Sequence, residues 1–371
     1  MNIASIRRKK ILIIGAGFSG RGFIGRLLHE NGCRITFADI NESLVRKLQN
    51  AKEYNIYLGA ERKRYKMDGF EACHIEERAA LDAAVEADYI FVSIGEENLK
   101  NLKDFFQKLS LLKDAAQIQV VVCENGLAPK KVLKDALQDT AARQMLISQA
   151  VIFCTTISND KGVSLNILSE DYNSLPYDID EGLFKLPFEH FVPETHFDLL
   201  LKRKIYTYNC LSACIAYLGY CKGYTNYADA ANDNEIKELC HRLKGNLDDV
   251  LSREFGVTFE EQSAFSKRAL DKFCDRTIVD TIYKNVRNAV RKLAPEERLI
   301  GPLRIMIENG KNCDDLCKVI AAALRYLKNE ECMKYEGVVY SDIIEFFSDI
   351  SQYDINNEVV GKISSYYEKL D

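Results

Sequence analysis

The chain has 371 residues, of which 47% are hydrophobic and 28% are charged, so it is long enough for two domains with ordinary cores. A formal charge of −5 and a pI near 5.8 give no reason to expect nucleic acid or an anionic membrane as a partner. The twelve cysteines include no C-x-x-C pair, and the five histidines have no H-x-x-x-H spacing. We therefore expect free thiols in a reducing compartment and no metal site.

The N-terminal segment loosely resembles a signal peptide, because Arg7-Arg8-Lys9-Lys10 precedes an apolar run. That run has only four residues before glycines interrupt it, and no apolar segment approaches the length needed to span a membrane. We therefore expect a cytoplasmic protein with no targeting segment.

The first predicted strand runs directly into a glycine-rich turn. Ile11 to Ile14 form a buried apolar run, and the next eight residues are Gly15-Ala16-Gly17-Phe18-Ser19-Gly20-Arg21-Gly22. Apolar residues at helical spacing follow, so the pattern is strand, turn and helix. This geometry presents backbone N–H groups and a helix N-terminus to a pyrophosphate. In that role Gly15 permits the turn, Gly17 permits close approach, and Gly20 permits tight packing of helix on strand.

The second predicted strand, residues 34–39, ends in an acidic residue. Asp39 lies 19 residues after Gly20. A carboxylate at this position accepts hydrogen bonds from the ribose hydroxyls and repels the 2′-phosphate of NADP. We therefore expect NAD as the cofactor; the alternative is a glycine turn that binds no ligand.

Strands and helices alternate up to about residue 155. Further strands are predicted at 88–95, 117–126 and 145–154, helices at 41–51, 77–87, 98–112 and 129–142, and hairpin-like material at 54–75. This alternation predicts the α/β class, with a Rossmann-like, doubly wound parallel sheet. Ligands bind at the carboxyl ends of the strands in such a sheet. Glu124 and Asn125 also lie at such an end, so we include them among the predicted cofactor residues.

The remainder of the chain has a different character. Residues 160–196 hold three of the six prolines and read as a linker-like end of the first domain, with one possible strand at 163–168. Beyond it, helices are predicted near 197–222, 231–255, 259–274, 277–293, 301–309, 312–329, 341–352 and 356–370, and Thr258 opens a capping box. We therefore predict an NAD-binding Rossmann domain over 1–196 and an all-helical domain for substrate and catalysis over 197–371.

The first helix of the second domain carries a candidate catalytic group. Oxidation of an alcohol needs a base for the hydroxyl proton and donors for the developing oxyanion. At about 100° per residue, Lys204, Asn209 and Ser212 can share one face of an α-helix. A lysine becomes a usable base when burial lowers its pKa. An ordinary amphipathic helix with a solvated lysine explains the same spacing.

Several stretches resemble the polyol-specific long-chain dehydrogenases, which form the mannitol dehydrogenase family, and they follow the family's order. They are the glycine turn with residues 36–39, Cys123-Glu124-Asn125, residues 204–209, residues 216–219, residues 291–293, and Arg298-Leu-Ile-x-Pro-Leu303. The resemblance implies a Rossmann domain, a helical substrate domain with the active site between the two, NAD, and no metal. It also implies interconversion of a polyol with its ketose, with mannitol 1-phosphate and fructose 6-phosphate as the leading pair.

The family's catalytic signature is Lys, four residues, Asn, two residues and His. By resemblance, Lys204 is the general base and Asn209 belongs to the oxyanion site. The histidine position is Ser212 here, which can make a hydrogen bond but cannot carry charge. The family also tends to have an arginine after its sixth strand, which the matching residues 153–160 lack, so Thr155 and Asn159 remain there as substrate candidates.

Other side chains are candidates for the missing functions. A proton relay in place of the histidine can come from His190, His196 or Tyr208. A phosphate group would be held by cations such as Arg287, Arg291 and Lys292, although a solvated helix face explains these residues equally well. Two other functions stay open: a related dehydrogenase for another sugar acid or hydroxy compound, and a catalytically impaired NAD-binding sensor or scaffold. The expected partner is a small polyol or polyol phosphate, and the sequence leaves the oligomeric state open.

Overall fold

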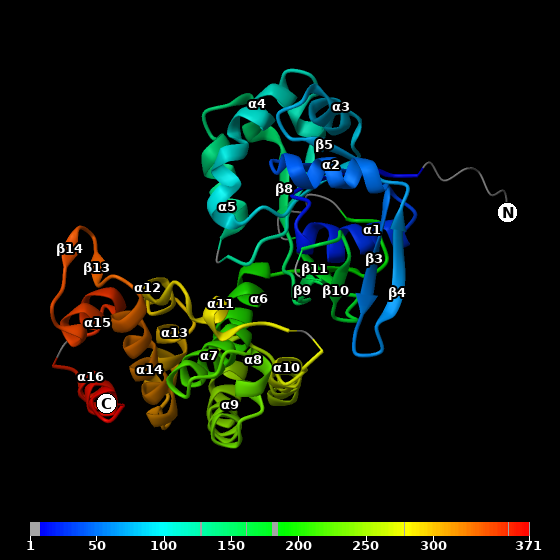
Figure 1. Cartoon of the computed structure of the whole chain (residues 1–371). Helices are drawn as coiled ribbons and strands as arrows, with labels where there is room; N and C mark the ends of the chain where they lie inside the picture. Colours follow the sequence, from blue (N-terminus) through cyan, green and yellow to red (C-terminus); the bar gives the residue numbers. More distant parts are fainter. Residues whose placement is uncertain are drawn as a thin grey trace. The chain divides into compact units, whose positions relative to one another are not determined.

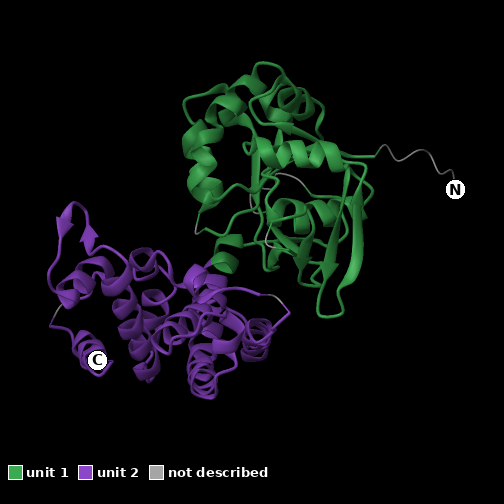
Figure 2. Ribbon diagram, viewed as in Figure 1, with its two compact units in different colours: residues 1–201 green, residues 202–371 purple. Residues whose placement is uncertain are grey.

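The computed structural model describes residues 8–126, 128–160, 162–179, 185–277, 279–354 and 356–370. Arg7, in the segment that resembles a signal peptide, lies outside these residues. The chain divides into two compact units, Met1–Leu201 and Lys202–Asp371 (Figure 2). The dividing point falls within helix α6 (Phe197–Lys204), just after the boundary predicted from the sequence.

A six-stranded sheet forms the centre of the first unit (Figure 1). Its strands, in spatial order, are β5 (Glu71–His74), β2 (Arg34–Asp39), β1 (Lys10–Ile14), β6 (Tyr89–Val92), β7 (Gln119–Val122) and β8 (Leu146–Gln149). All neighbouring pairs are parallel, which confirms the predicted fold class. The strand order reverses between β1 and β6, and this switch point is where such sheets bind ligands.

Separate apolar clusters cover the two faces of this sheet. Successive residues of a strand point to opposite faces, so Ile11 and Ile13 join one cluster while Leu12 and Ile14 join the other. The helical segments of this unit are η1 (Gly20–Ile24), α1 (Gly25–Glu30), α2 (Glu42–Ala51), α3 (Arg78–Glu86), η2 (Glu96–Leu102), α4 (Lys103–Ser110), η3 (Ala115–Gln117), α5 (Pro129–Leu137) and η4 (Ala141–Gln144). The N-terminus of α2 is capped by the Asn41 side chain, which confirms the prediction there.

A second, smaller sheet packs against the cluster that contains Ile11 and Ile13. It consists of β4 (Lys63–Asp68), β3 (Glu53–Leu58), β10 (Ile167–Ser169) and β9 (Thr156–Ser158), and a parallel pair β11 (Leu175–Asp178) and β12 (Phe191–Glu194) follows it. The hairpin predicted in residues 54–75 is confirmed by β3 and β4. The strand predicted at 163–168 is wrong in its extent, since only the last part of it pairs.

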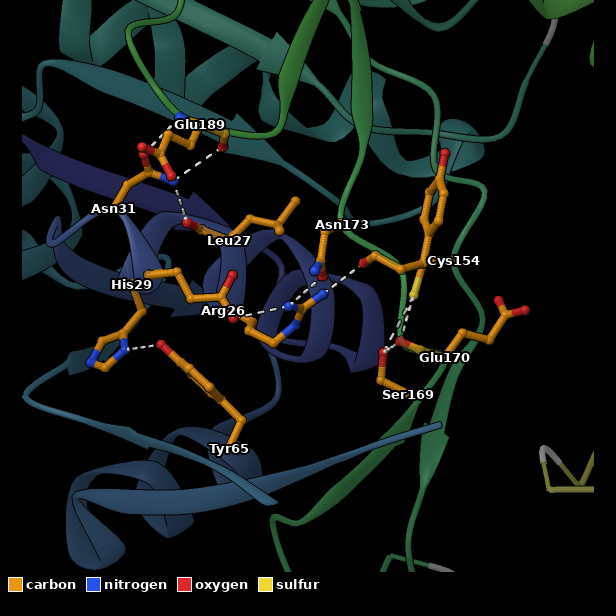
Figure 3. Close-up of polar contacts among 12 residues, drawn as sticks. Arg26, Leu27, His29, Asn31, Tyr65, Cys154, Ser169, Glu170, Asn173 and Glu189 are labelled. Carbon is orange, nitrogen blue, oxygen red and sulfur yellow. Dashed lines mark hydrogen bonds and ion pairs between the residues drawn. The ribbon is translucent and has the colours of Figure 1, made fainter. Parts of the chain in front are cut away.

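The buried guanidinium of Arg26 fastens α1 to the loop after β10 (Figure 3). It donates to the Tyr172 carbonyl at 2.7 Å and to Asn173 Oδ1 at 2.8 Å. Nearby, the Cys154 thiol lies 3.3 Å from Ser169 Oγ. Because a buried charge is costly without partners, these bonds fix the position of the smaller sheet against α1.

In its described residues, the second unit is helical apart from one short hairpin. Its helical segments are η5 (Ile205–Asn209), α7 (Cys210–Cys221), α8 (Tyr227–Ala231), α9 (Asn234–Glu254), α10 (Phe259–Phe273), α11 (Ile282–Val286), α12 (Ala289–Lys292), α13 (Ile300–Glu308), α14 (Asp314–Glu330), α15 (Ile343–Ser351) and α16 (Glu358–Glu368). The capping box at Thr258 is confirmed. The hairpin of β13 (Lys334–Tyr335) and β14 (Val338–Val339) was not predicted. Among the described residues, no helix has the length and apolar character of a membrane span.

The single helix predicted over 277–293 is wrong. The chain forms α11 and α12 instead, and Arg287 and Asn288 separate them. Asn288 has φ +60, in the left-handed region that asparagine tolerates better than most residues. Arg287 therefore lies at the end of a short helix and not on a continuous helical face.

Candidate active site

The glycine turn after β1 has two positions where only glycine fits. Gly15 has φ +99, and a Cβ there would lie 2.0 Å from the Ser93 carbonyl oxygen. A Cβ on Gly20 would lie 2.0 Å from the Gly15 carbonyl oxygen. Gly17 differs, because no atom lies within 4 Å of the position its Cβ would occupy. The turn is thus closed by packing at Gly15 and Gly20 and open to a ligand at Gly17.

The residues after Gly20 support the turn from within the protein. Arg21, predicted as a cofactor residue, is buried and donates to the carbonyls of Ala16 at 2.6 Å and Leu165 at 2.8 Å. A Cβ on Gly22 would lie 2.8 Å from Ile167 Cγ2 of β10. These contacts support the turn structurally, and the cofactor role of Arg21 and Gly22 stays a prediction. Of the remaining predicted residues of the turn, Phe18 is exposed and Ser19 is half-buried.

A cavity of about 860 Å³ extends from Gly15 and Gly17 along the end of β2. Asp39 lies in its wall, and its carboxylate accepts hydrogen bonds from Ala16 N at 2.7 Å and from Asn41 N at 2.8 Å. These bonds hold the carboxylate in place, and each of its oxygens can accept a further bond. Apolar side chains continue the wall, namely Ile40, Ile75, Leu81, Ile94 and Phe105.

These features fit a dinucleotide. The open turn can hold a pyrophosphate, the fixed carboxylate can accept from ribose hydroxyls, and the apolar wall can cover an adenine ring. The three sets of residues lie along one cavity at the carboxyl ends of β1 and β2.

Glu124 organises the neighbouring strand end. Its buried carboxylate accepts hydrogen bonds from Ile94 N at 2.6 Å and Gly95 N at 2.9 Å. Burial raises the pKa of Glu124 to about 7, against the opposing effect of these two bonds. Asn125 follows it and is exposed. Glu124 thus fixes the loop after β6, including Ile94 in the cavity wall.

In the second unit, Lys204 and Asn209 lie at the two ends of a π-helical turn. The turn is η5, and the Cys210 N–H donates to the Ile205 carbonyl, the i to i+5 bond of a π-helix. Residues five apart are far round an α-helix but nearly in line on a π-helix. The turn therefore brings Asn209 closer to the face of Lys204 than the separation of about 140° in an α-helix would.

Lys204 is buried, with 7% of its surface exposed. Burial lowers the pKa of Lys204 to about 7, and the positive charges of Lys272 and Arg298 add to this effect. A substantial fraction of the side chain is therefore the neutral amine near pH 7, and a neutral amine can accept a proton. The solvated lysine that was the alternative from sequence does not match this environment.

Ser212 has a partner that the sequence did not indicate. The Tyr227 hydroxyl donates to Ser212 Oγ at 2.9 Å and approaches the Ser212 carbonyl at 3.3 Å. Because that bond uses a lone pair of Oγ, the Ser212 proton remains for another acceptor. Tyr227 belongs to α8, so no spacing within the Lys204 helix could have found it.

A small polar pocket of about 200 Å³ adjoins these residues, and Asn209 and Ser212 line it. Cationic side chains form much of the rest of its wall, namely Lys284, Arg287, Arg291, Lys292 and Arg298. Arg298 also donates to the Glu297 carboxylate at 3.0 Å. The structure thus places Arg287, predicted as a substrate residue, in the same pocket as Asn209 and Ser212.

The other sequence candidates do not share this pocket. Thr155 and Asn159 flank β9 in the first unit, where the Thr155 N–H donates to the Glu170 carboxylate and Asn159 Oδ1 accepts from Arg62 at 3.3 Å. Among the relay candidates, His190 and His196 are exposed in the first unit. Tyr208 is buried, with its ring 4.8 Å from that of Phe265.

Potential metal ligands do not gather in the part of the chain that the structure describes. No group of three or more His, Cys, Asp and Glu side chains there is arranged to hold an ion. Of the two cysteine pairs spaced by four residues, Cys210 and Cys214 lie on α7, whereas Cys313 precedes α14, which holds Cys317; all four thiols are buried. Packing in the apolar core explains the positions of these four cysteines.

Two family descriptions match the chain in sequence. Residues 9–161 match the mannitol dehydrogenase Rossmann domain, and residues 196–367 match the mannitol dehydrogenase C-terminal domain. Together they span most of the chain.

Full-length relatives are similar over nearly the whole chain. A mannitol-1-phosphate 5-dehydrogenase of Clostridium acetobutylicum is 28% identical over 382 residues, covering 97% of this chain and 99% of that protein. A mannitol-1-phosphate 5-dehydrogenase of an Arthrobacter species is 29% identical over 336 residues, covering 85% of this chain and 86% of that protein.

Solved structures share the fold. A substrate-free D-sorbitol dehydrogenase has a TM-score of 0.71 at 14% identity, covering 98% of this chain and 92% of its own. Pseudomonas fluorescens mannitol 2-dehydrogenase, solved as a ternary complex with NAD and D-mannitol, has a TM-score of 0.71 at 16% identity, covering 98% of this chain and 91% of its own.

Proposed function

The chain belongs to the mannitol dehydrogenase family of NAD-dependent oxidoreductases that act on CH–OH groups, and we propose that it interconverts a polyol phosphate and its ketose. The leading pair is mannitol 1-phosphate and fructose 6-phosphate, which the names of the full-length relatives support. The observation that carries this proposal is a buried Lys204, with a pKa lowered to about 7, one π-turn from Asn209.

In the proposed reaction Lys204 is the general base. Its neutral amine takes the proton of the substrate hydroxyl, and burial favours that neutral form before substrate arrives. The Asn209 amide donates a hydrogen bond to the oxygen as negative charge develops on it. Ser212, held by Tyr227, donates its own proton to a substrate oxygen in the pocket it lines. NAD, when bound, supplies the two-electron oxidant.

The first unit holds the cofactor in this proposal. The open side of the glycine turn at Gly17 takes the pyrophosphate through backbone N–H groups. Asp39 accepts from the ribose hydroxyls, and its charge disfavours the 2′-phosphate of NADP. Glu124 has a positioning role, because it holds the loop at Ile94 and Gly95 that forms part of the cavity wall.

A substrate panel tests the function. Polyols, polyol phosphates and aldonates are each offered to the intact chain with NAD, and NADH absorbance is followed. The expected result is turnover of mannitol 1-phosphate well above that of every unphosphorylated polyol. Turnover confined to another class of hydroxy compound would contradict the proposed substrate while leaving the dehydrogenase assignment in place.

A second candidate substrate class has specific support. Ser212 replaces the family's histidine, and residues 153–160 lack the family's arginine, so a related sugar acid or another hydroxy compound is the alternative. A catalytically impaired NAD-binding sensor is the other reading of the same changes. A buried lysine with a lowered pKa argues against impairment, because burying that charge is costly and a sensor has no need of a base.

A further inference from the structure

We propose that the cationic pocket beside Asn209 and Ser212 binds the phosphoryl group of the substrate, and that Arg287 sets the preference for phosphorylated over unphosphorylated polyols. This inference rests on the proposed function, since it assigns one part of that substrate to one part of the second unit.

The charge of the pocket calls for an anion. Five cationic side chains line it, and the carboxylates that pair with or face them are Asp280, Glu297 and Glu331. Glu331 also accepts a hydrogen bond from Ala289 N at 3.1 Å. Positive charge is therefore in excess even when Lys292 is neutral, because four other cations face three carboxylates. A dianionic group supplies the missing negative charge.

Lys292 shows how the cations affect one another. Its side chain is buried, and its ammonium donates to the Asn285 carbonyl at 2.5 Å and lies over the Tyr217 ring. Burial lowers the pKa of Lys292 to about 7, and repulsion from Arg298 and Arg291 contributes. A bound phosphoryl group would relieve this repulsion, so the pocket gains more from an anion than isolated surface cations would.

Of the five cationic side chains, Arg287 is the most available to a ligand. The other four have a partner oxygen: Asp280 for Lys284, Glu297 for Arg291 and Arg298, and the Asn285 carbonyl for Lys292. Among the described residues, no carboxylate pairs with Arg287, whose guanidinium lies 5.9 Å from the Tyr283 ring centre. The planar guanidinium can bind two phosphate oxygens at once.

The break between α11 and α12 builds the pocket. Asn288, with its left-handed backbone, separates the two short helices, so Arg287 in the break and Arg291 on α12 line one space. At about 200 Å³ the pocket is smaller than sites for whole drug-sized ligands, and it suits a phosphoryl group with its nearest carbon. Asn209 and Ser212 line the same pocket, so a substrate bound there lies beside the proposed oxyanion site.

The test compares Arg287→Gln with wild type and with Arg253→Gln. Arg253 is a matched control, because it is an exposed arginine on α9 of the same unit, paired only with Asp249. We expect Arg287→Gln to raise KM for mannitol 1-phosphate roughly 10- to 100-fold, the loss typical of a charged hydrogen-bonded pair. KM for NAD should not change, and KM for unphosphorylated mannitol should rise far less than KM for mannitol 1-phosphate. An unchanged KM for mannitol 1-phosphate, or an equal loss with both polyols, overturns the assignment.

Inorganic phosphate separates this inference from the proposed function. In wild type it should inhibit competitively against mannitol 1-phosphate, and in Arg287→Gln that inhibition should weaken by a similar factor. Non-competitive inhibition would mean a separate phosphate site and would overturn the assignment. If no polyol is turned over, the melting temperature gives the answer. If phosphate stabilises wild type and Arg253→Gln but not Arg287→Gln, the pocket assignment is supported although the proposed function has failed. If phosphate changes the melting temperature of all three proteins equally, or of none, the pocket assignment is overturned.

Discussion

Asn209 follows Lys204 by one π-helical turn, and this turn sets the relation between the proposed base and the proposed oxyanion donor. In an α-helix the two side chains would point about 140° apart. The i to i+5 bond at Cys210 reduces this angle, because a π-helix has more residues per turn than an α-helix. The base and the donor can therefore act on the same substrate oxygen, which is what alcohol oxidation requires.

Replacement of Lys204 by alanine tests the base. Lys204→Ala should lower kcat for polyol oxidation roughly 10²- to 10⁴-fold, the usual contribution of a positioned general base. NAD affinity, measured by titration of the cofactor, should stay close to the wild-type value. Lys202→Ala, two residues earlier on α6 and about one-third exposed, is the matched control and should keep most of its activity. Substantial turnover by Lys204→Ala would contradict the assigned role.

The pH profile should report the same group. Because the pKa of Lys204 is lowered to about 7, the base is protonated and inactive below that pH. We expect kcat/KM for polyol oxidation to rise about tenfold per pH unit up to about pH 7 and then level. Glu124 and Lys292 also have pKa values near 7, so the profile is repeated with Glu124→Gln and Lys292→Gln. Loss of the break in either variant would assign it to that residue instead.

Lys204 also makes stability depend on pH. Between about pH 7 and pH 10.5 the folded chain binds fewer protons at this group than the unfolded chain does. The free energy of unfolding should therefore rise with pH across this window, relative to a Lys204→Met variant that cannot titrate there. Parallel pH dependence in the two proteins, measured by denaturant unfolding, would show that the pKa is not lowered.

The glycine turn allows a paired test of fold and ligand. Gly15→Ala places a Cβ against the Ser93 carbonyl at positive φ, and we expect it to destabilise the first unit by about 1–3 kcal/mol. Gly17→Ala meets no protein atom, so it should fold normally while NAD affinity falls, because the new methyl enters the open side of the turn. Thermal unfolding and NAD titration on both variants check this. Normal NAD binding by Gly17→Ala would place the cofactor elsewhere.

Asp39 should control the choice of cofactor. Asp39→Ser removes a carboxylate that bonds Ala16 N and is proposed to bond ribose. KM for NAD should rise roughly 10- to 100-fold, and the preference for NAD over NADP should shrink. Asp82→Asn, on an exposed face of α3 and paired with Arg78, is the control and should change neither value. Steady-state kinetics with both cofactors give the ratio.

Ser212 and Tyr227 should act as one unit. Ser212→Ala and Tyr227→Phe should each lower kcat/KM by roughly 5- to 20-fold, the range expected for a lost hydrogen bond to a partly charged group. The double variant should lose little more than either single one, since both remove the same contact. Fully additive losses would mean that the two residues work separately.

The parallel sheet was predictable because its signals are local. Ile11 to Ile14 are apolar in succession, and the glycines follow without a gap, so strand and turn can be identified from adjacent residues. The edge strand β5 was missed, because it lies in a segment that reads as a hairpin. Only its pairing with β2, which is far away in sequence, makes it part of the parallel sheet. Likewise, the break at Asn288 depends on one left-handed residue in a segment whose composition is helical.

The site was predictable in part for the same reason. Motif and charge were enough to propose Lys204, Asn209 and Arg287. Tyr227 contacts Ser212 from another helix, so no sequence spacing indicates it. The buried contacts of Arg21 were not foreseeable either, because Leu165 is remote in sequence. Local sequence patterns identify candidate side chains, whereas contacts between distant segments determine which of these side chains are available to a ligand.

The support behind the glycine turn has a thermodynamic consequence. Arg21 holds the Ala16 carbonyl, Tyr54 holds the Arg21 carbonyl at 3.0 Å, and Ile167 packs against Gly22. Because these contacts come from the protein itself, we expect little conformational entropy to be lost from the loop when a nucleotide binds. The hydrogen-bonded amides of Gly15, Ala16 and Arg21 should exchange slowly without NAD, and the association rate for NAD should approach that of a rigid, preformed receptor.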